Sequence, residues 1–159
     1  MKLLIVIDID ETIVCQAPVG CSHRIKLSYK SDITNKQVKH FIKTRPHFDD
    51  FLKYCFEIAD VGIWSMGQPS YVNSVAELFP MIPLFVNTWV NCDRQQSFVY
   101  KNLDTLNHQK YDKIIMIDDN FKVIRWTVDN IIPMEIDEWE GDSEDSKLIE
   151  IMNDLKLLL

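Results

Sequence analysis

Carboxylates directly follow two apolar runs of this sequence. Asp8 and Asp10 come after the run KLLIVI at the start of the chain. Asp118 and Asp119 end the run KIIMIDD. A carboxylate at the end of a buried strand is costly unless it is paired or bound to a cation. Four of them at one edge would repel one another, which raises their pKa values. A hard divalent cation relieves both costs, and Mg²⁺ suits a few carboxylates together with a phosphate.

The spacing within the first segment strengthens the prediction of a metal and phosphate site. Asp8, Asp10 and Thr12 form a D-x-D-x-T pattern. A single D-x-D is explained by strand ends and turns alone. Two carboxylate pairs after two buried strands instead favour one shared site, with Ser65 at the end of a third apolar run beside it.

Strands and helices alternate along the chain, and this alternation would bring the polar strand ends together. Residues 2–8 and 113–118 are short, apolar and rich in β-branched side chains, which predicts strands buried on both faces. Shorter strands are expected at 61–65 and 131–134. The alternation predicts an α/β fold with a parallel sheet and right-handed crossovers. Ligands of such sheets bind beyond the carboxyl ends of the strands.

Three helices are expected to flank the sheet. The first begins at Pro46, the second begins at Pro69, and the last follows the acidic residues 142–145. One apolar stripe marks the first helix: Phe48, Phe51, Leu52, Cys55 and Phe56.

Two segments predict additions to the sheet. Alternation within residues 23–43 predicts an antiparallel hairpin with its lysines on the solvent face. Residues 84–90 and 97–100 flank the polar stretch NCDRQQ, which suggests a loop or a hairpin.

Composition narrows the classes of function. The 159 residues suit one domain spanning 1–159, and we expect a monomer. The net charge of −7 disfavours non-specific binding to nucleic acid or to a membrane surface. No apolar run is long enough to cross a bilayer, and no signal peptide is evident, so a cytoplasmic or nuclear location is expected. The four cysteines form no C-x-x-C pair and are expected to be free thiols.

The motifs together resemble a known family. VIDIDETIV resembles the first motif of the haloacid dehalogenase superfamily in its D-x-D-x-T phosphatase form. Four further segments resemble the RNA polymerase II C-terminal-domain (CTD) phosphatase branch, including its small members: TRP at 44–46, IWSMG with Tyr71 beyond it, VYKNL with Lys101, and IMIDDN. The resemblance runs over residues 3–158. It implies a Rossmann-like parallel sheet with flanking helices and a small antiparallel hairpin, without a large cap domain.

The resemblance assigns the chemistry to two aspartates. Asp8 would be the nucleophile and a metal ligand. Asp10 would be the general acid and base, with its main-chain carbonyl on the metal. A carboxylate that forms an aspartyl-phosphate divides one hard displacement into two easier ones. A carboxylate two residues on can protonate the leaving oxygen and then activate water.

The remaining site residues also follow from the resemblance. Thr12, Ser65 and Lys101 would bind the phosphoryl group, and Lys101 would neutralise the phosphoaspartate. Asp118 and Asp119 would hold Mg²⁺, one of them directly. Small CTD phosphatases often carry asparagine where this chain has Asp119, which makes this site one charge more negative.

The expected function is a Mg²⁺-dependent phosphatase of phosphoserine or phosphothreonine in a protein, such as the RNA polymerase II tail. A small-metabolite or nucleotide phosphatase and a catalytically silent binding module are the alternatives. The expected peptide groove is formed by the hairpin, Tyr71 and the 84–97 segment with Trp89 and Arg94. Trp89 falls near the position at which small CTD phosphatases place a substrate-contacting arginine.

Overall fold

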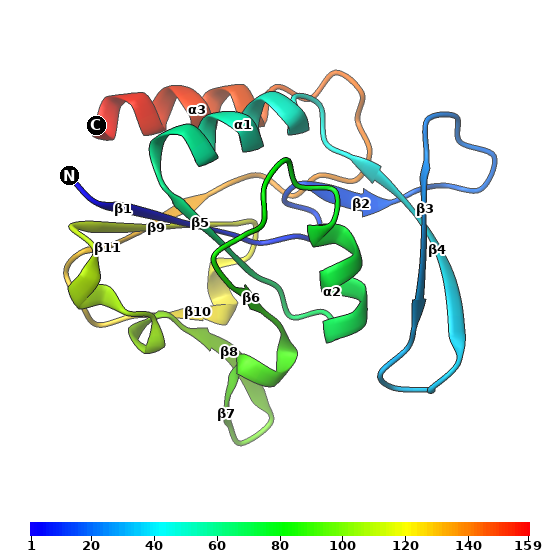
Figure 1. The fold of residues 1–159 in the computed structure, drawn as a ribbon, viewed down its shortest axis with the longest axis horizontal. Coiled ribbons are helices and arrows are strands. Elements are labelled where there is room, and N and C mark those ends of the chain that lie inside the picture. Colours follow the sequence, from blue (N-terminus) through cyan, green and yellow to red (C-terminus); the bar gives the residue numbers. More distant parts are fainter.

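A five-stranded parallel sheet forms the centre of the computed structural model, which describes all of residues 1–159 (Figure 1). Its strand order is β11-β9-β1-β5-β6, and every neighbouring pair is parallel. The strands are β1 (Leu3–Ile7), β5 (Asp60–Trp64), β6 (Val86–Asn87), β9 (Lys113–Asp118) and β11 (Ile131–Glu135). The predicted α/β architecture is therefore confirmed.

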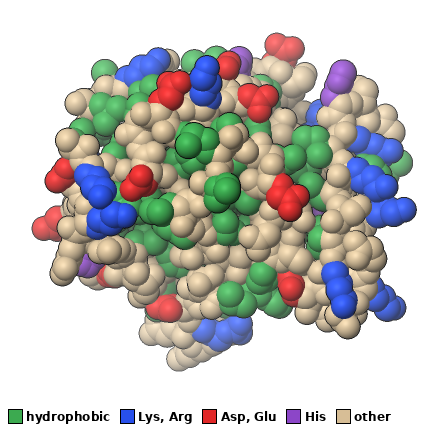
Figure 2. Space-filling view, in the orientation of Figure 1, with side chains coloured by type: hydrophobic (Ala, Val, Ile, Leu, Met, Phe, Trp, Pro, Cys, Tyr) green, Lys and Arg blue, Asp and Glu red, His purple; other side chains and the backbone are tan.

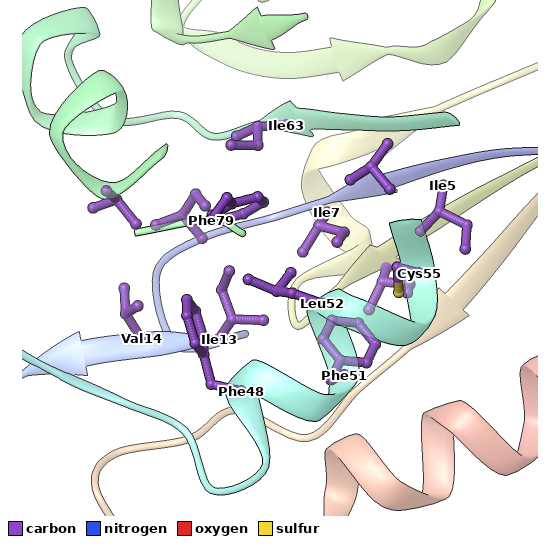
Figure 3. Packing of buried hydrophobic residues seen from close by; sticks show 14 of the residues in the cluster. Ile5, Ile7, Ile13, Val14, Phe48, Phe51, Leu52, Cys55, Ile63 and Phe79 are labelled. Carbon is purple, nitrogen blue, oxygen red and sulfur yellow. The ribbon is translucent and has the colours of Figure 1, made fainter. Parts of the chain in front are cut away.

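The central strands are buried on both faces, as the sequence predicts. Along β1, Leu3, Ile5 and Ile7 belong to one apolar cluster, while Leu4 and Val6 belong to a second cluster across the sheet. Figure 3 shows side chains of the first strand and of the first helix meeting in the larger cluster. This two-sided burial fixes the strand ends, and with them the residues that follow.

Three helices flank the sheet: α1 (Phe48–Ile58), α2 (Pro69–Ala76) and α3 (Lys147–Leu158). Helices α1 and α3 lie side by side (Figure 1). Pro69 is the first residue of α2, as predicted, but α1 begins at Phe48 rather than at Pro46. His47 has φ 70°, and the amide of Phe48 donates to the carbonyl of Arg45, so a turn precedes the helix. None of the helices is long and apolar enough to cross a membrane.

Two small sheets complete the fold. The predicted hairpin forms from β3 (Ile25–Lys30) and β4 (Gln37–Thr44), and β4 also pairs with the unpredicted strand β2 (Val14–Gln16). The other sheet contains β7 (Asp93–Gln95), β8 (Phe98–Asn102) and β10 (Ile124–Arg125). Short 3₁₀ helices are Trp89–Asn91, Leu103–Thr105, His108–Lys110 and Phe121–Val123.

The second hairpin differs from the sequence prediction in its strands. The polar stretch is not the connecting loop, because its residues 93–95 form β7 and pair with β8. Residues 84–90 contribute only the two-residue strand β6 and the start of a 3₁₀ helix. The amide of Thr88 donates to Oδ1 of Asn91 at 2.9 Å, and this contact turns the chain before a longer strand can form.

Candidate active site

The carboxyl ends of β1, β5 and β9 meet at a pocket of about 290 Å³. Six of the predicted residues line it: Asp8, Asp10, Ser65, Lys101, Asp118 and Asp119. Five of them lie at or just after the ends of strands of the parallel sheet, which places them at one edge, as expected for this type of fold. Lys101 reaches the same pocket from β8 of the small sheet. Thr12 is fully buried and contacts the pocket through Asp8.

Asp8 is held by a hydrogen bond to each of its carboxylate oxygens. Nζ of Lys101 donates to Oδ1 at 2.8 Å, and the hydroxyl of Thr12 donates to Oδ2 at 2.7 Å. Nζ of Lys101 also donates to Oδ2 of Asp118 at 2.6 Å. The ammonium group therefore bridges the two strand ends and fixes the orientation of the Asp8 carboxylate.

Lys101 is charged although it is almost fully buried. Burial disfavours the ammonium form, but the neighbouring carboxylates of Asp8 and Asp118 outweigh it and raise the pKa of Lys101 above its ordinary value. The Lys101 ammonium group can therefore neutralise charge on an anion bound in the pocket while it stays buried.

Asp8, Asp118 and Asp119 offer the ligand set of a metal site. One carboxylate oxygen from each lies within 4.8 Å of the others. Burial, followed by the charge of Asp8, raises the pKa of Asp118 to about 6 and that of Asp119 to about 8. Three carboxylates are crowded here, and Lys101 is the cation that neutralises two of them. Their hard oxygen donors therefore suit a divalent cation such as Mg²⁺.

Asp10 has a different environment from Asp8. The hydroxyl of Tyr71 donates to Oδ1 of Asp10 at 2.5 Å. Burial raises the pKa of Asp10, the hydrogen bond from Tyr71 lowers it, and the charge of Asp8 raises it, with a net increase. The two aspartates of the first motif are therefore placed in distinct states, one paired with a cation and one with a neutral donor. This difference suits a nucleophile and a general acid.

Ser65 lies at the end of β5, in a tight loop. Its hydroxyl accepts a hydrogen bond from the amide of Gly67 at 3.1 Å, and its own amide donates to the carbonyl of Asn87. The hydroxyl proton of Ser65 has no acceptor among these contacts, so the hydroxyl can donate a hydrogen bond to an oxygen in the pocket.

The residues predicted to form the peptide groove do not line the pocket together. Tyr71 is 7% exposed, with its ring packed against Tyr29 and His40, so it supports Asp10 from within the fold. Trp89 and Arg94 are exposed and do not line the pocket, although the amide of Trp89 donates to the carbonyl of Gly67. A role for these two residues in substrate binding stays a prediction.

A buried ion pair that contacts the first motif is not evident from the sequence. The guanidinium of Arg45 forms two hydrogen bonds to Asp145, at 2.8 and 2.9 Å, and a third to the carbonyl of Thr12 at 3.0 Å. Through the carbonyl of Thr12, these contacts hold the backbone of the first motif in place. Arg45 lies within Thr-Arg-Pro and Asp145 within the acidic stretch GDSED, and the 100 residues between them leave no sequence signal of the pair.

Comparison with known proteins finds relatives over nearly the whole chain. A protein of Dictyostelium discoideum described as CTD small phosphatase-like protein 2 is 27% identical over 99% of this chain and 27% of its own length. The human CTD small phosphatase-like protein is 24% identical over 95% of this chain and 54% of its own length. This chain thus spans about a quarter to about half of these relatives.

The fold also matches a solved structure. It is a variant of the fission yeast RNA polymerase II CTD phosphatase Fcp1 bound to beryllium fluoride, with a TM-score of 0.64 and 20% identity. The match covers 99% of this chain and 50% of the other. The family model described as NLI interacting factor-like phosphatase matches residues 3–159. The resemblance to CTD phosphatases is confirmed, and the chain belongs to the NLI interacting factor-like phosphatase family.

Proposed function

We propose that this chain hydrolyses phosphomonoesters through an aspartyl-phosphate on Asp8, with Mg²⁺ as cofactor. The observation that carries the proposal is the placement of Lys101 between Asp8 and Asp118 at the mouth of the sheet. The cation holds one oxygen of Asp8 and Thr12 holds the other, so the nucleophile is oriented before substrate binds. Such preorganisation is most of what a protein contributes to phosphoryl transfer.

In the first step an oxygen of Asp8 bonds to phosphorus as the bond to the leaving oxygen breaks. Asp10 gives its proton to that leaving oxygen, and its raised pKa favours the protonated form needed for this. Lys101 and the hydroxyl of Ser65 stabilise charge on the phosphoryl oxygens. In the second step Asp10 takes a proton from water, and the water oxygen bonds to phosphorus as the bond between phosphorus and the Asp8 oxygen breaks. Inorganic phosphate leaves, and the Asp8 carboxylate is regenerated.

Mg²⁺ would be held by Asp8, Asp118 and Asp119, together with the main-chain carbonyl of Asp10, and would offset negative charge on the phosphate. The crowding of the three carboxylates supports this assignment. Substrates are phosphoserine or phosphothreonine side chains of proteins, of which the RNA polymerase II C-terminal domain is one candidate. Relatives described as CTD phosphatases support this choice.

The proposal is tested by measuring hydrolysis of four kinds of substrate, each with Mg²⁺ and with a chelator. They are an aryl phosphate, a phosphoserine heptad peptide, free phosphoserine and nucleoside monophosphates. We expect Mg²⁺-dependent turnover that is lost in Asp8→Asn, and the highest kcat/KM for the peptide. Full turnover by Asp8→Asn would exclude the covalent route. A preference for the small phosphates would favour a metabolite phosphatase, and no turnover of any substrate would favour a silent binding module.

A further inference from the structure

The charges of this chain are strongly segregated. Residues 14–47 contain seven of the 17 lysines and arginines but only one of the 24 acidic residues. This segment therefore carries a net charge of +6 in a chain with a net charge of −7. It consists of β2, β3, β4 and their connections, so the positive charge is concentrated in one small sheet.

Strand register gathers these charges on one face of the hairpin. Lys26 and Lys30 alternate with inward residues along β3, and Lys39 and Lys43 do so along β4. The opposite face carries Leu27, Tyr29 and His40, which pack toward the rest of the fold. We call the surface formed by Lys26, Lys30, Lys39 and Lys43 the basic face. Figure 2 shows lysine and arginine side chains gathered over the region of β3 and β4.

Nothing within the chain neutralises the basic face. None of its four lysines forms an ion pair. Asp32, the one acidic residue of the segment, has another partner, because its carboxylate accepts from the amide and the hydroxyl of Ser70, both at 2.7 Å. Like charges held on neighbouring strands repel one another, so this face favours an anionic partner.

The hairpin is also attached to the candidate active site. At its turn, the hydroxyl of Ser31 and the amide of Asp32 donate to Oε1 of Gln68, at 3.1 and 2.7 Å. Gln68 follows Gly67, which lines the active-site pocket. At the other end of the basic face, Lys43 lines a second hollow of about 540 Å³ together with His23 and His47. Gln68 therefore links the rim of the pocket to the hairpin turn that directly follows Lys30 of the basic face.

We propose that the basic face binds an acidic or multiply phosphorylated segment of the protein substrate, adjacent to the phosphoserine in the active site. This inference rests on the proposed phosphatase function. In an extended peptide, alternate side chains are about 7 Å apart, the spacing of alternate side chains on the strands that present these lysines. Carboxylates or phosphates at alternate positions of the peptide would therefore match the spacing of the lysines.

Nucleic acid fits this surface less well than an acidic peptide. Sites for single strands combine positive charge with aromatic side chains on which bases stack. The one aromatic residue on this face is Phe41, and the guanidinium of Arg24 covers it at 4.0 Å from the ring centroid. The negative net charge of the whole chain also opposes a long polyanion.

The test compares two phosphopeptides with the same reactive phosphoserine, one flanked by acidic residues and one by alanine and serine. At low salt we expect kcat/KM to be about five- to tenfold higher for the acidic peptide, through KM rather than kcat. The gain should shrink in high salt. It should be lost in Lys26→Gln/Lys39→Gln and retained in Lys26→Arg/Lys39→Arg. Turnover of an aryl phosphate should be unchanged in both variants.

Lys53→Gln/Lys110→Gln is the matched control, because it removes the same charge from exposed positions elsewhere. An equal loss in this control, or an acidic peptide no better than the plain one, overturns the proposal. So does tighter binding of single-stranded RNA, anionic vesicles or a second copy of this chain to the basic face. If no phosphomonoester is hydrolysed, anisotropy with the two labelled peptides still tests the surface. Preferential binding of the acidic peptide would then uphold the basic face although the proposed function had failed.

Discussion

The hydroxyl of Tyr71 donates a hydrogen bond to Oδ1 of Asp10 at 2.5 Å, and the phenol ring is almost fully buried. The ring stacks on His40 with centroids 5.2 Å apart, and it lies 5.9 Å from the ring of Tyr29. The hairpin and α2 thus jointly fix the side chain that we assign as general acid and base. Tyr71 is a positioning residue in this arrangement.

Tyr71→Phe should therefore reduce turnover more than it reduces substrate binding. The ring and its packing remain, while Asp10 loses the donor that holds its carboxyl group. We expect kcat to fall about tenfold with KM nearly unchanged, because the variant loses one charge-assisted hydrogen bond. Steady-state kinetics on an aryl phosphate measures this, and Tyr29→Phe is the control because its hydroxyl does not reach Asp10. An unchanged kcat in Tyr71→Phe would show that Asp10 does not depend on this contact.

Lys101→Met should abolish turnover and also change how the protein responds to Mg²⁺. Without the ammonium group, Asp8 and Asp118 are left as unpaired neighbouring carboxylates in a buried site. We expect a lower melting temperature than wild type in chelator and a larger increase on adding Mg²⁺, since a cation then replaces the lysine. Thermal unfolding with and without Mg²⁺ checks this. An equal Mg²⁺-induced shift in both proteins would contradict the electrostatic role of Lys101.

Binding of Mg²⁺ should release a proton from Asp119. Burial and the charge of Asp8 raise the pKa of Asp119 to about 8, so its carboxyl group is mostly protonated at neutral pH in the absence of metal. A metal ligand must be ionised, so titration with Mg²⁺ at about pH 7 should release about one proton. Release should fall towards zero as the pH rises above the pKa of Asp119. Calorimetry in buffers of different ionisation enthalpy measures it, and Asp119→Asn should remove most of the release.

The sequence predicted the parallel sheet well because its central strands carry an unambiguous signal. Residues 3–7 and 114–117 are buried on both faces, so every position in them is apolar until the chain reaches the site. The same two runs end in the aspartates that meet in the pocket. The polar stretch at 93–95 carries no such signal, because its strand pairs through the backbone at the edge of a small sheet.

Contacts between distant segments were beyond sequence reasoning. Tyr71 lies 61 residues from Asp10, and no periodicity shows that its ring turns inward and supports the general acid. Similarly, the carboxylates of GDSED read as residues that cap a helix. Asp145 does accept from the amide of Lys147 near the start of α3, but its main partner is the guanidinium 100 residues earlier in the chain.

That pairing of Arg45 with Asp145 should be a major determinant of stability. The guanidinium is fully buried and has three hydrogen bonds. Arg45→Leu therefore leaves the Thr12 carbonyl without its side-chain donor and the Asp145 carboxylate without its cationic partner. We expect a loss of about 3 kcal/mol in the free energy of unfolding. Denaturant titration measures it. Lys147→Ala, which breaks exposed ion pairs, is the control and should cost less than about 0.5 kcal/mol.

The contribution of this ion pair should also depend on pH. Burial opposes ionisation of Asp145, but its hydrogen bonds with Arg45 outweigh this effect and lower its pKa below the ordinary value. A depressed pKa in the folded state stabilises the protein above the pKa of unfolded aspartate, about 3.9, and this stability is lost as the pH falls below it. The difference in unfolding free energy between wild type and Asp145→Asn should therefore be largest near neutral pH and shrink in acid. A difference that stays constant across this range would show that the Asp145 charge does not provide the stability.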